Sequence, residues 1–268
     1  MTTSEQTLSP AAETNGQLWG GKARVWADIQ EPISLPLYVA ALERAGVGTG
    51  TRYLDVGCGS GNAAAVAAQR GAQVSGLDAS GALLAIARER VPAADLRRGE
   101  LEALPFETGT FEVVTGFNSF QFAARPIVAL QEARRVAGPG ARIVIATWGR
   151  PEDTEAAAVL AALRPLLPAP PPGAPGPFAL SDEGTLRKLA QEAGLSPVEV
   201  IDVSCPFVYP DLATALHGLG SSGVAVKAAQ LAGEEAVTRA NTEMLVPFKK
   251  SDGGYRIENK FRFLLSTV

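Results

Sequence analysis

The chain has 268 residues, which is long enough for one sizeable α/β domain with an insertion. Its formal net charge of -4 argues against a basic face for nucleic acid or anionic lipid. The two cysteines, Cys58 and Cys205, lie too far apart in the sequence to suggest a disulfide framework, which favours a reducing compartment. With no signal-peptide pattern and no apolar run of membrane-spanning length, we expect a cytoplasmic protein without nucleic-acid or membrane partners.

The first 46 residues divide into two parts. Residues 1–15 are small and polar, and we interpret them as a flexible tail. Residues 16–46 carry regularly spaced aromatic and aliphatic side chains, interrupted by Pro32 and Pro36, which predicts one or two short helices. We interpret this segment as a helical lid placed ahead of the main domain, residues 47–268.

From residue 47 onward, short β-type runs alternate with Ala-rich helical runs. Such alternation is typical of a doubly wound, mostly parallel sheet with helices on both faces. The seven predicted strands are 53–56, 73–77, 95–98, 111–117, 142–147, 198–203 and 260–268, and the helices between them include 63–70, 81–90 and 126–136.

Two segments interrupt this alternation after the fifth strand. The run RPLLPAPPPGAPGPF, residues 164–178, holds too many prolines for helix or sheet and predicts an irregular connection. Residues 206–254 are mostly helical in pattern and rich in apolar side chains, which predicts an insertion before the last strand. This insertion is well placed to form a lid over a small acceptor, although the same apolar residues could form the face of a homodimer.

The strongest chemical signal is LDVGCGSG, residues 54–61, where a strand runs into a glycine-rich turn and then a helix. Gly57, Gly59 and Gly61 allow a ligand to approach the backbone closely. Their spacing departs from the dinucleotide pattern G-x-G-x-x-G, which would need its third glycine at Asn62. Asp55, just before the glycines, would repel a pyrophosphate and attract a cationic amino group. The turn therefore favours a ligand that contains an amino acid.

A second signal follows about twenty residues later. Asp78 ends the second strand in GLDAS, at the position from which a carboxylate can accept hydrogen bonds from both hydroxyls of a ribose. The two signals together predict a nucleoside joined to an amino acid.

These motifs resemble those of the class I S-adenosylmethionine-dependent methyltransferases. LDVGCGSG and GLDAS are similar to the family's first two motifs, and RRGELEALPF, FEVVTGFNSFQF and RRVAGPGARIVI to the segments that follow, so that the resemblance covers roughly residues 45–150. It implies S-adenosylmethionine as cofactor and methyl transfer to a small, partly apolar organic acceptor, in specialised or secondary metabolism. It does not identify the acceptor.

The resemblance also implies roles for individual residues. Gly57, Cys58 and Gly59 would pass the methionine moiety with Asp55 near its amino group, and Asp78 would hold the ribose. The remaining cofactor-binding candidates are Ala79, Leu83, Glu100 and Leu101 around the adenine, Asn118 and Ser119 beside the reactive methyl, Gly61 in the turn, and Trp26 from the N-terminal segment, which could equally be a core residue.

Several functional points stay open at this level. His217, the only histidine, is a candidate catalytic base together with Tyr209 and Tyr255, although a solvent-facing histidine is the commoner case. No cluster of histidine and cysteine has metal-ligand spacing, so we expect no metal. Two other functions remain: a non-methylating enzyme that catalyses a rearrangement or cyclisation, and a non-catalytic cofactor-binding module.

Overall fold

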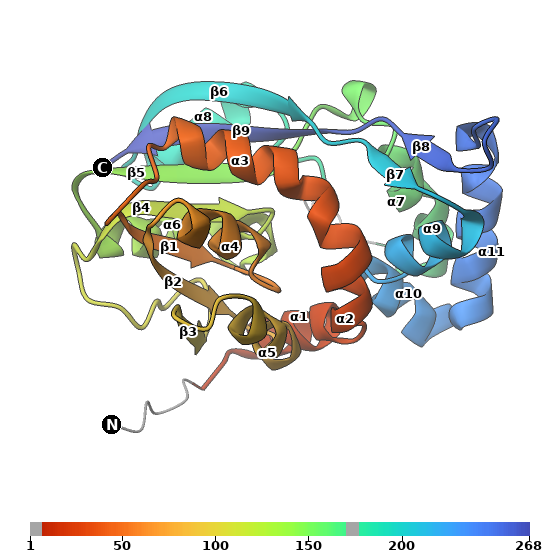
Figure 1. Cartoon of the computed structure of the whole chain (residues 1–268), viewed down its shortest axis with the longest axis horizontal. Coiled ribbons are helices and arrows are strands. Elements are labelled where there is room, and N and C mark those ends of the chain that lie inside the picture. The colour runs from red at the N-terminus through yellow and green to blue at the C-terminus, as the bar shows by residue number, and fades with distance from the viewer. Residues whose placement is uncertain (1–6, 170–176) are drawn as a thin grey trace.

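The computed structural model describes residues 7–169 and 177–268, and its core is a twisted seven-stranded sheet (Figure 1). The strand order is β3-β2-β1-β4-β5-β9-β6. The strands are β1 (Arg52–Val56), β2 (Gln73–Asp78), β3 (Asp95–Arg98), β4 (Phe111–Phe117), β5 (Ala137–Trp148), β6 (Ser196–Ser204) and β9 (Lys260–Thr267).

All strands of this sheet run parallel except β9, which lies antiparallel between β5 and β6. The order reverses direction between β1 and β4, so a crevice opens at the carboxyl ends of these two strands. The predicted fold class, a doubly wound and mostly parallel seven-stranded sheet with an insertion before the last strand, is confirmed.

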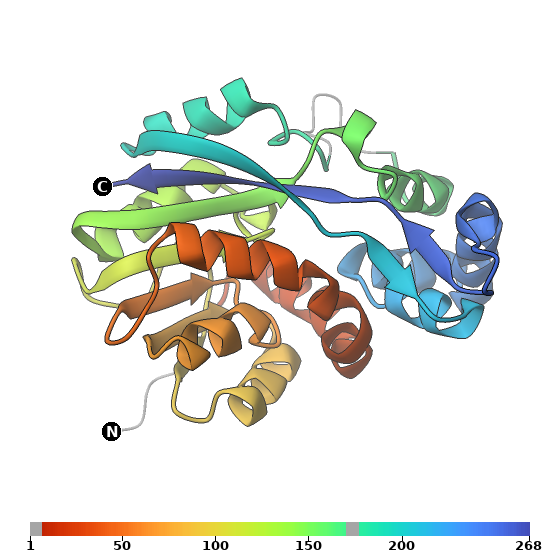
Figure 2. The same ribbon diagram turned by 45° about the horizontal axis from the view of Figure 1, so that its top comes forward.

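Both faces of the sheet are covered because its buried strands are apolar on both sides. In β5, Val144 and Ala146 belong to one hydrophobic cluster, and the alternating Ile143 and Ile145 belong to another. Helices α3 (Leu35–Arg44) and α4 (Asn62–Gln69) complete the first cluster, and α6 (Pro126–Val136) and α8 (Glu183–Glu192) complete the second. Helix α5 (Gly81–Arg90) packs beside α4 and on β3 (Figure 2).

The N-terminal segment is more ordered than the sequence suggested. Helix α1 (Pro10–Gly20) begins five residues before the predicted end of the flexible tail, so that prediction is wrong for residues 10–15. Ser9 caps the helix by accepting a hydrogen bond from the backbone N–H of Ala12, and Pro10 occupies the first turn, where its missing N–H costs nothing. Residues 1–6 of the predicted tail lie outside the described residues.

Between α1 and α3 the chain makes several short turns of different helix type. Helix α2 (Ala23–Val25) leads into a π-helical turn, Trp26–Gln30, and then a 3-10 turn, Glu31–Ser34. Pro32 and Pro36 stand in the first turns of the 3-10 turn and of α3, where proline is compatible with a helix. Because a π turn takes more than four residues, both Gln30 and Glu31 return to the side of Trp26.

The insertion lies beside the carboxyl ends of the strands (Figures 1 and 2). It is mainly helical, with α9 (Leu212–Leu219), α10 (Gly223–Ala232) and α11 (Glu234–Leu245), and α11 packs on α7 (Ala157–Leu163). It also contains β7 (Phe207–Tyr209), which pairs with β8 (Tyr255–Ile257) in a small antiparallel sheet that the sequence did not predict. The middle of the predicted irregular connection, 170–176, lies outside the described residues. In the part of the chain described, we found no helix with the length and apolar character needed to cross a bilayer.

Candidate active site

A cavity of about 550 Å³ opens at the carboxyl ends of β1, β2 and β4. Its walls come from the turns after these strands, from α1 and the π turn, and from the insertion. Twelve residues predicted to bind the cofactor line it: Trp26, Asp55, Gly57, Cys58, Gly59, Asp78, Ala79, Leu83, Glu100, Leu101, Asn118 and Ser119. These twelve residues come from positions 26 to 119 of the chain, and the cavity brings them together.

The glycine-rich turn forms the floor of this cavity. Gly57 and Gly59 have φ values of +79° and +55°, in the left-handed region that favours glycine. A Cβ on Gly57 would overlap the side chain of Ser119, so β1 and the end of β4 approach closely here. Gly61, with φ +83°, caps α4 and packs against Ala87 outside the cavity lining. Its role in the structure is to start the helix.

Asp78 stands at the end of β2 beside this turn. One carboxylate oxygen accepts a hydrogen bond from the Gly59 N–H at 2.9 Å, and the other accepts from the Ser80 N–H at 2.8 Å. Burial raises the pKa of Asp78, and the backbone donors at Ser80 and Gly59 oppose that rise. A carboxylate can accept about four hydrogen bonds, so each oxygen retains capacity for one more donor.

Two further carboxylates are buried near the turn. Asp55 is 2 % exposed and accepts a hydrogen bond from the Thr115 hydroxyl at 2.9 Å, while Tyr53 contacts Thr115 at 2.6 Å. Glu31 is 5 % exposed; it accepts a hydrogen bond from the Ser60 hydroxyl. Burial, the largest cause for each, raises the pKa of Asp55 and of Glu31 to about 7, and the nearby carboxylates add to it. A cation bound between these groups would favour their ionised forms.

The N-terminal helix closes the side of the cavity that holds the predicted adenine contacts. The Ser9 N–H donates to a carboxylate oxygen of Glu100 at 3.0 Å. Helix α1 passes so close to β2 that a Cβ on Gly16 would lie 2.6 Å from the carbonyl oxygen of Ala79. An ion pair of 2.7 Å between Glu13 of α1 and Arg98 of β3 also stabilises the packing of α1 against the sheet.

The end of β4 is conformationally unusual. Asn118 has φ +50° and is the only non-glycine residue with positive φ among the described residues. Such strain is found most often at functional sites, where the surrounding structure holds it in place. The hydroxyl of the neighbouring Ser119 is buried at the cavity wall without a hydrogen-bond partner in the described structure. A ligand in the cavity is a candidate partner for this hydroxyl.

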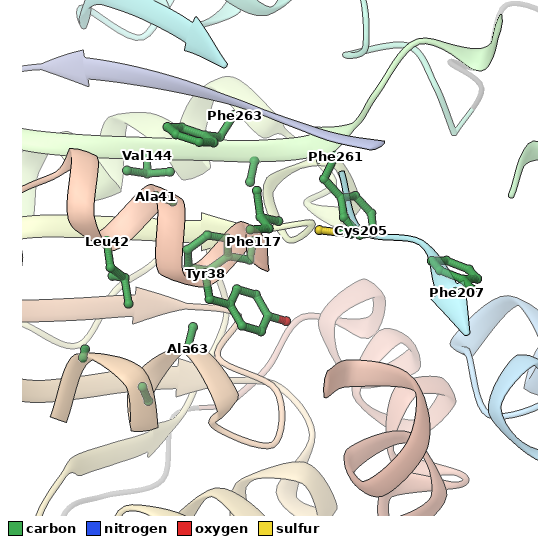
Figure 3. Close-up of a cluster of buried hydrophobic side chains, with 14 of the residues drawn as sticks. Tyr38, Ala41, Leu42, Ala63, Phe117, Val144, Cys205, Phe207, Phe261 and Phe263 are labelled. Carbon is green, nitrogen blue, oxygen red and sulfur yellow. The ribbon is translucent and has the colours of Figure 1, made fainter. Parts of the chain in front are cut away.

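The part of the cavity near the insertion is aromatic and aliphatic. Phe117, Phe261 and Phe207 follow one another from the sheet toward β7 (Figure 3). Trp148 packs against Phe261 with ring centroids 5.1 Å apart. Further apolar residues on this side are Ala156, Val159, Leu160, Leu189, Leu219 and Val224. Trp26 packs edge-on against Trp19, so it is both a core and a cavity residue.

The charges around the cavity all have one sign. Five carboxylates line it, and no lysine, arginine or histidine occurs among the described lining residues; the five are Glu31, Asp55, Asp78, Glu100 and Glu102. A negative potential in a partly buried cavity attracts a cationic ligand and disfavours an anionic one.

The three candidate catalytic residues do not occur among the described residues that line the cavity. His217 lies exposed near the end of α9. Tyr209 is buried in β7 and donates its hydroxyl proton to Gln30, and Tyr255 is its partner across the β7–β8 pair. The tyrosines therefore belong to the packing of the insertion.

Among the polar residues of the cavity that sequence reasoning missed are Gln30, Glu31 and Tyr38. Burial raises the pKa of the Tyr38 hydroxyl well above its usual range, and its ring packs edge-on against Phe117, 4.8 Å away. Each comes from the segment between α2 and the middle of α3, whose short, varied turns carry no motif. One available signal was the polar pair Gln30 and Glu31 between the apolar residues Ile29 and Ile33.

Comparison with known proteins gives a consistent result. The family model described as "Methyltransferase domain" matches residues 54–145, which run from β1 into β5. An uncharacterized protein of Mycobacterium tuberculosis (strain H37Rv) is 36 % identical over 168 residues, which cover 61 % of this chain and 60 % of that protein. The chain thus spans about 60 % of the length of this relative.

Two further similarities concern a named activity and the whole fold. The demethylmenaquinone methyltransferase of Renibacterium salmoninarum is 31 % identical over 138 residues, covering 52 % of this chain and 54 % of that enzyme. The crystal structure of the [4+2]-cyclase SpnF superposes with a TM-score of 0.63, covering 99 % of this chain and 98 % of that one, at 18 % identity. At that identity the likeness concerns the fold alone.

Proposed function

We propose that this chain is a class I methyltransferase that transfers a methyl group from S-adenosylmethionine to a small, partly apolar organic acceptor. The observation that carries the proposal is that every charged side chain among the described lining residues of this cavity is acidic. S-adenosylmethionine carries a sulfonium and an ammonium group, and its nucleoside offers two ribose hydroxyls as donors.

The donor and acceptor set of the cavity fits this cofactor. Asp78 retains one acceptor position on each oxygen, which suits the two ribose hydroxyls. Asp55 and Glu31 lie at the glycine-rich turn, where an ammonium group would find buried counter-charges. Glu100 and Leu101 face the same cavity near α1 and supply a carboxylate and a backbone N–H for a base.

When bound, S-adenosylmethionine supplies a methyl group that is already activated by the sulfonium. The protein's part is to hold the acceptor in line with the methyl group and to exclude water. The aromatic wall formed by Phe117, Trp148, Phe207 and Phe261 is suited to hold an apolar acceptor. Asn118 and Ser119 stand between this wall and the glycine-rich turn and present polar groups to the acceptor.

We propose that two segments act as lids over this cavity. Residues 16–46 contribute Gly16, Trp19 and Trp26 to its wall, and residues 206–254 contribute Phe207, Leu219 and Val224. The first segment adjoins the predicted cofactor contacts, whereas the second adjoins the aromatic wall. We therefore expect residues 16–46 to govern cofactor retention, and residues 206–254 to govern the choice of acceptor.

A screen of acceptors with S-adenosylmethionine labelled in its methyl group tests the proposed function. Mass spectrometry should find an acceptor that gains one labelled methyl group as S-adenosylhomocysteine accumulates. Neutral, partly apolar compounds should react in preference to phosphorylated or carboxylated analogues, because the cavity is lined by carboxylates. An acceptor that is converted without change of mass would instead support a rearrangement or cyclisation on this fold.

A further inference from the structure

Gln30 is a buried amide whose two ends face different surroundings. It is 8 % exposed and lines the cavity from the last position of the π turn. Its side-chain oxygen Oε1 accepts a hydrogen bond from the Tyr209 hydroxyl at 2.7 Å. The amide oxygen is thus held by the insertion, 179 positions away in the chain.

Packing fixes this orientation. Gly218 of α9 lies so close that a Cβ there would be 2.9 Å from Oε1 of Gln30 and 3.0 Å from the ring of Tyr209. The oxygen therefore points at α9, and the amide nitrogen Nε2 is left for the cavity side. No described residue accepts a hydrogen bond from Nε2, so this donor is available to a ligand.

The next residue, Glu31, offers the complementary chemistry. One of its carboxylate oxygens, Oε2, accepts from the Ser60 hydroxyl and lies 3.7 Å from the Arg90 guanidinium. The other, Oε1, lies 2.9 Å from the position of a Cβ on Gly59, and thus faces the glycine-rich turn. A donor and an acceptor therefore follow one another in the chain and both line the cavity.

An amino-acid group needs both kinds of partner, because it carries a carboxylate and an ammonium group. Proteins often hold the carboxylate of a ligand with arginine or lysine, but neither lines the described cavity. A neutral amide donor held in place can stabilise a buried carboxylate among so many acidic side chains.

We propose that Gln30 binds the carboxylate of the cofactor's amino-acid part through Nε2, with Glu31 as the partner of its ammonium group. Tyr209 acts as a positioning residue that keeps the amide nitrogen directed into the cavity. The inference rests on the proposed function, since it assumes S-adenosylmethionine as cofactor. It also gives the insertion a role in cofactor binding through one side chain.

The test compares two probes that share an adenosine and a thioether. S-adenosylhomocysteine has the amino-acid part and 5′-methylthioadenosine lacks it. By calorimetry, the unmodified protein should bind S-adenosylhomocysteine at least about tenfold more tightly. The Gln30→Met substitution should weaken the binding of S-adenosylhomocysteine by roughly 10- to 100-fold. It should change the affinity for 5′-methylthioadenosine by less than about twofold. Tyr209→Phe should produce the same selective effect at roughly 3- to 10-fold.

Gln121→Met is the matched control. Gln121 also lines the cavity, but its Nε2 already donates to the side chain of Asn118, so its loss should leave the ratio of the two affinities unchanged. Equal weakening of both probes by Gln30→Met, or no weakening of either, would overturn the inference. Tyr209→Phe retains the ring and keeps the test valid if Gln30→Met fails to fold. If the unmodified protein bound neither probe, the proposed function itself would fail, and a selective loss would be impossible.

Discussion

Replacing Asp78 by asparagine tests the ribose contact with little change of shape. The carboxylate of Asp78 already accepts hydrogen bonds from the Gly59 and Ser80 backbone, and its remaining capacity is what a ribose would use. The amide of asparagine has one oxygen and one NH2 group. It can therefore keep only one of the two acceptor positions that the carboxylate offers to a ribose. The substitution therefore removes one charge-assisted hydrogen bond to the ligand and turns the other into a neutral one.

The magnitude follows from the hydrogen bonds concerned. A hydrogen bond to a charged group contributes about 1.5–3 kcal/mol, which corresponds to roughly 10- to 150-fold in Kd. Stability should respond differently, because two effects oppose each other. The NH2 group of asparagine would face one of the two backbone N–H donors, which destabilises the folded protein. The substitution also removes a buried negative charge, which stabilises it, since burial disfavours the ionised form and raises the pKa of Asp78. We expect the melting temperature to move by less than roughly 5 °C.

Calorimetric titration with S-adenosylmethionine, paired with thermal unfolding, measures both quantities. Asp95→Asn is the matched control, because Asp95 is an exposed carboxylate at the start of the neighbouring strand β3, outside the cavity. The control should bind as the unmodified protein does. A Kd for Asp78→Asn within twofold of the unmodified value would refute the ribose assignment, and with it the order in which we place the cofactor along the cavity.

Four further predictions concern this site and the segments around it. Gly59→Val should reduce cofactor affinity by at least roughly tenfold, because φ is +55° at this position and a Cβ would lie 2.9 Å from a carboxylate oxygen of Glu31. Circular dichroism should still show a folded protein. Normal cofactor affinity in this variant would mean that the turn has a structural role only. The pKa values of Glu31 and Asp55, about 7 in the folded protein and near 4 when unfolded, mean that the ligand-free protein binds more protons than the unfolded chain between these values. Their contribution to stability should therefore decline from about pH 4 to about pH 7, which unfolding by urea at several pH values would measure. A free energy of unfolding that rose over this range would contradict the prediction. Exchanging residues 206–254 for those of a relative should change which acceptor is methylated. The His217→Ala substitution should leave turnover within about tenfold of the unmodified protein, because this histidine is exposed. A loss of turnover of roughly 10² or more with substrate binding intact would instead identify His217 as the catalytic base.

The sheet and the glycine-rich turn could be predicted because local patterns determine them. The strand at residues 95–98 appears in the structure with the predicted bounds, since a short β-type run between two helical runs has few alternatives in a doubly wound fold. The glycines at 57 and 59 stand in the predicted turn, and their left-handed backbone is one that glycine adopts without strain. Each of these features depends on residues close together in the chain.

The features that the sequence did not reveal depend on distant contacts. Residues 10–15 of helix α1 were assigned to a tail because they are small and polar, but Glu13 pairs with Arg98, and Gly16 in the next turn packs on Ala79. The role of Gln30 depends on a hydroxyl 179 positions away and on a π turn, which has no sequence signature. Tyr209 was considered as a catalytic base from its residue type alone, whereas the structure gives its hydroxyl a fixed partner, Gln30.

The most direct test of methyl transfer is the balance between cofactor and acceptor in one reaction. The protein is incubated with methyl-labelled S-adenosylmethionine and an acceptor from the screen, and both products are counted by mass spectrometry. The account predicts one S-adenosylhomocysteine for each acceptor that gains a labelled methyl group, with both yields lowered together in Asp78→Asn. Conversion of the acceptor to an isomer while S-adenosylmethionine remains intact would contradict it.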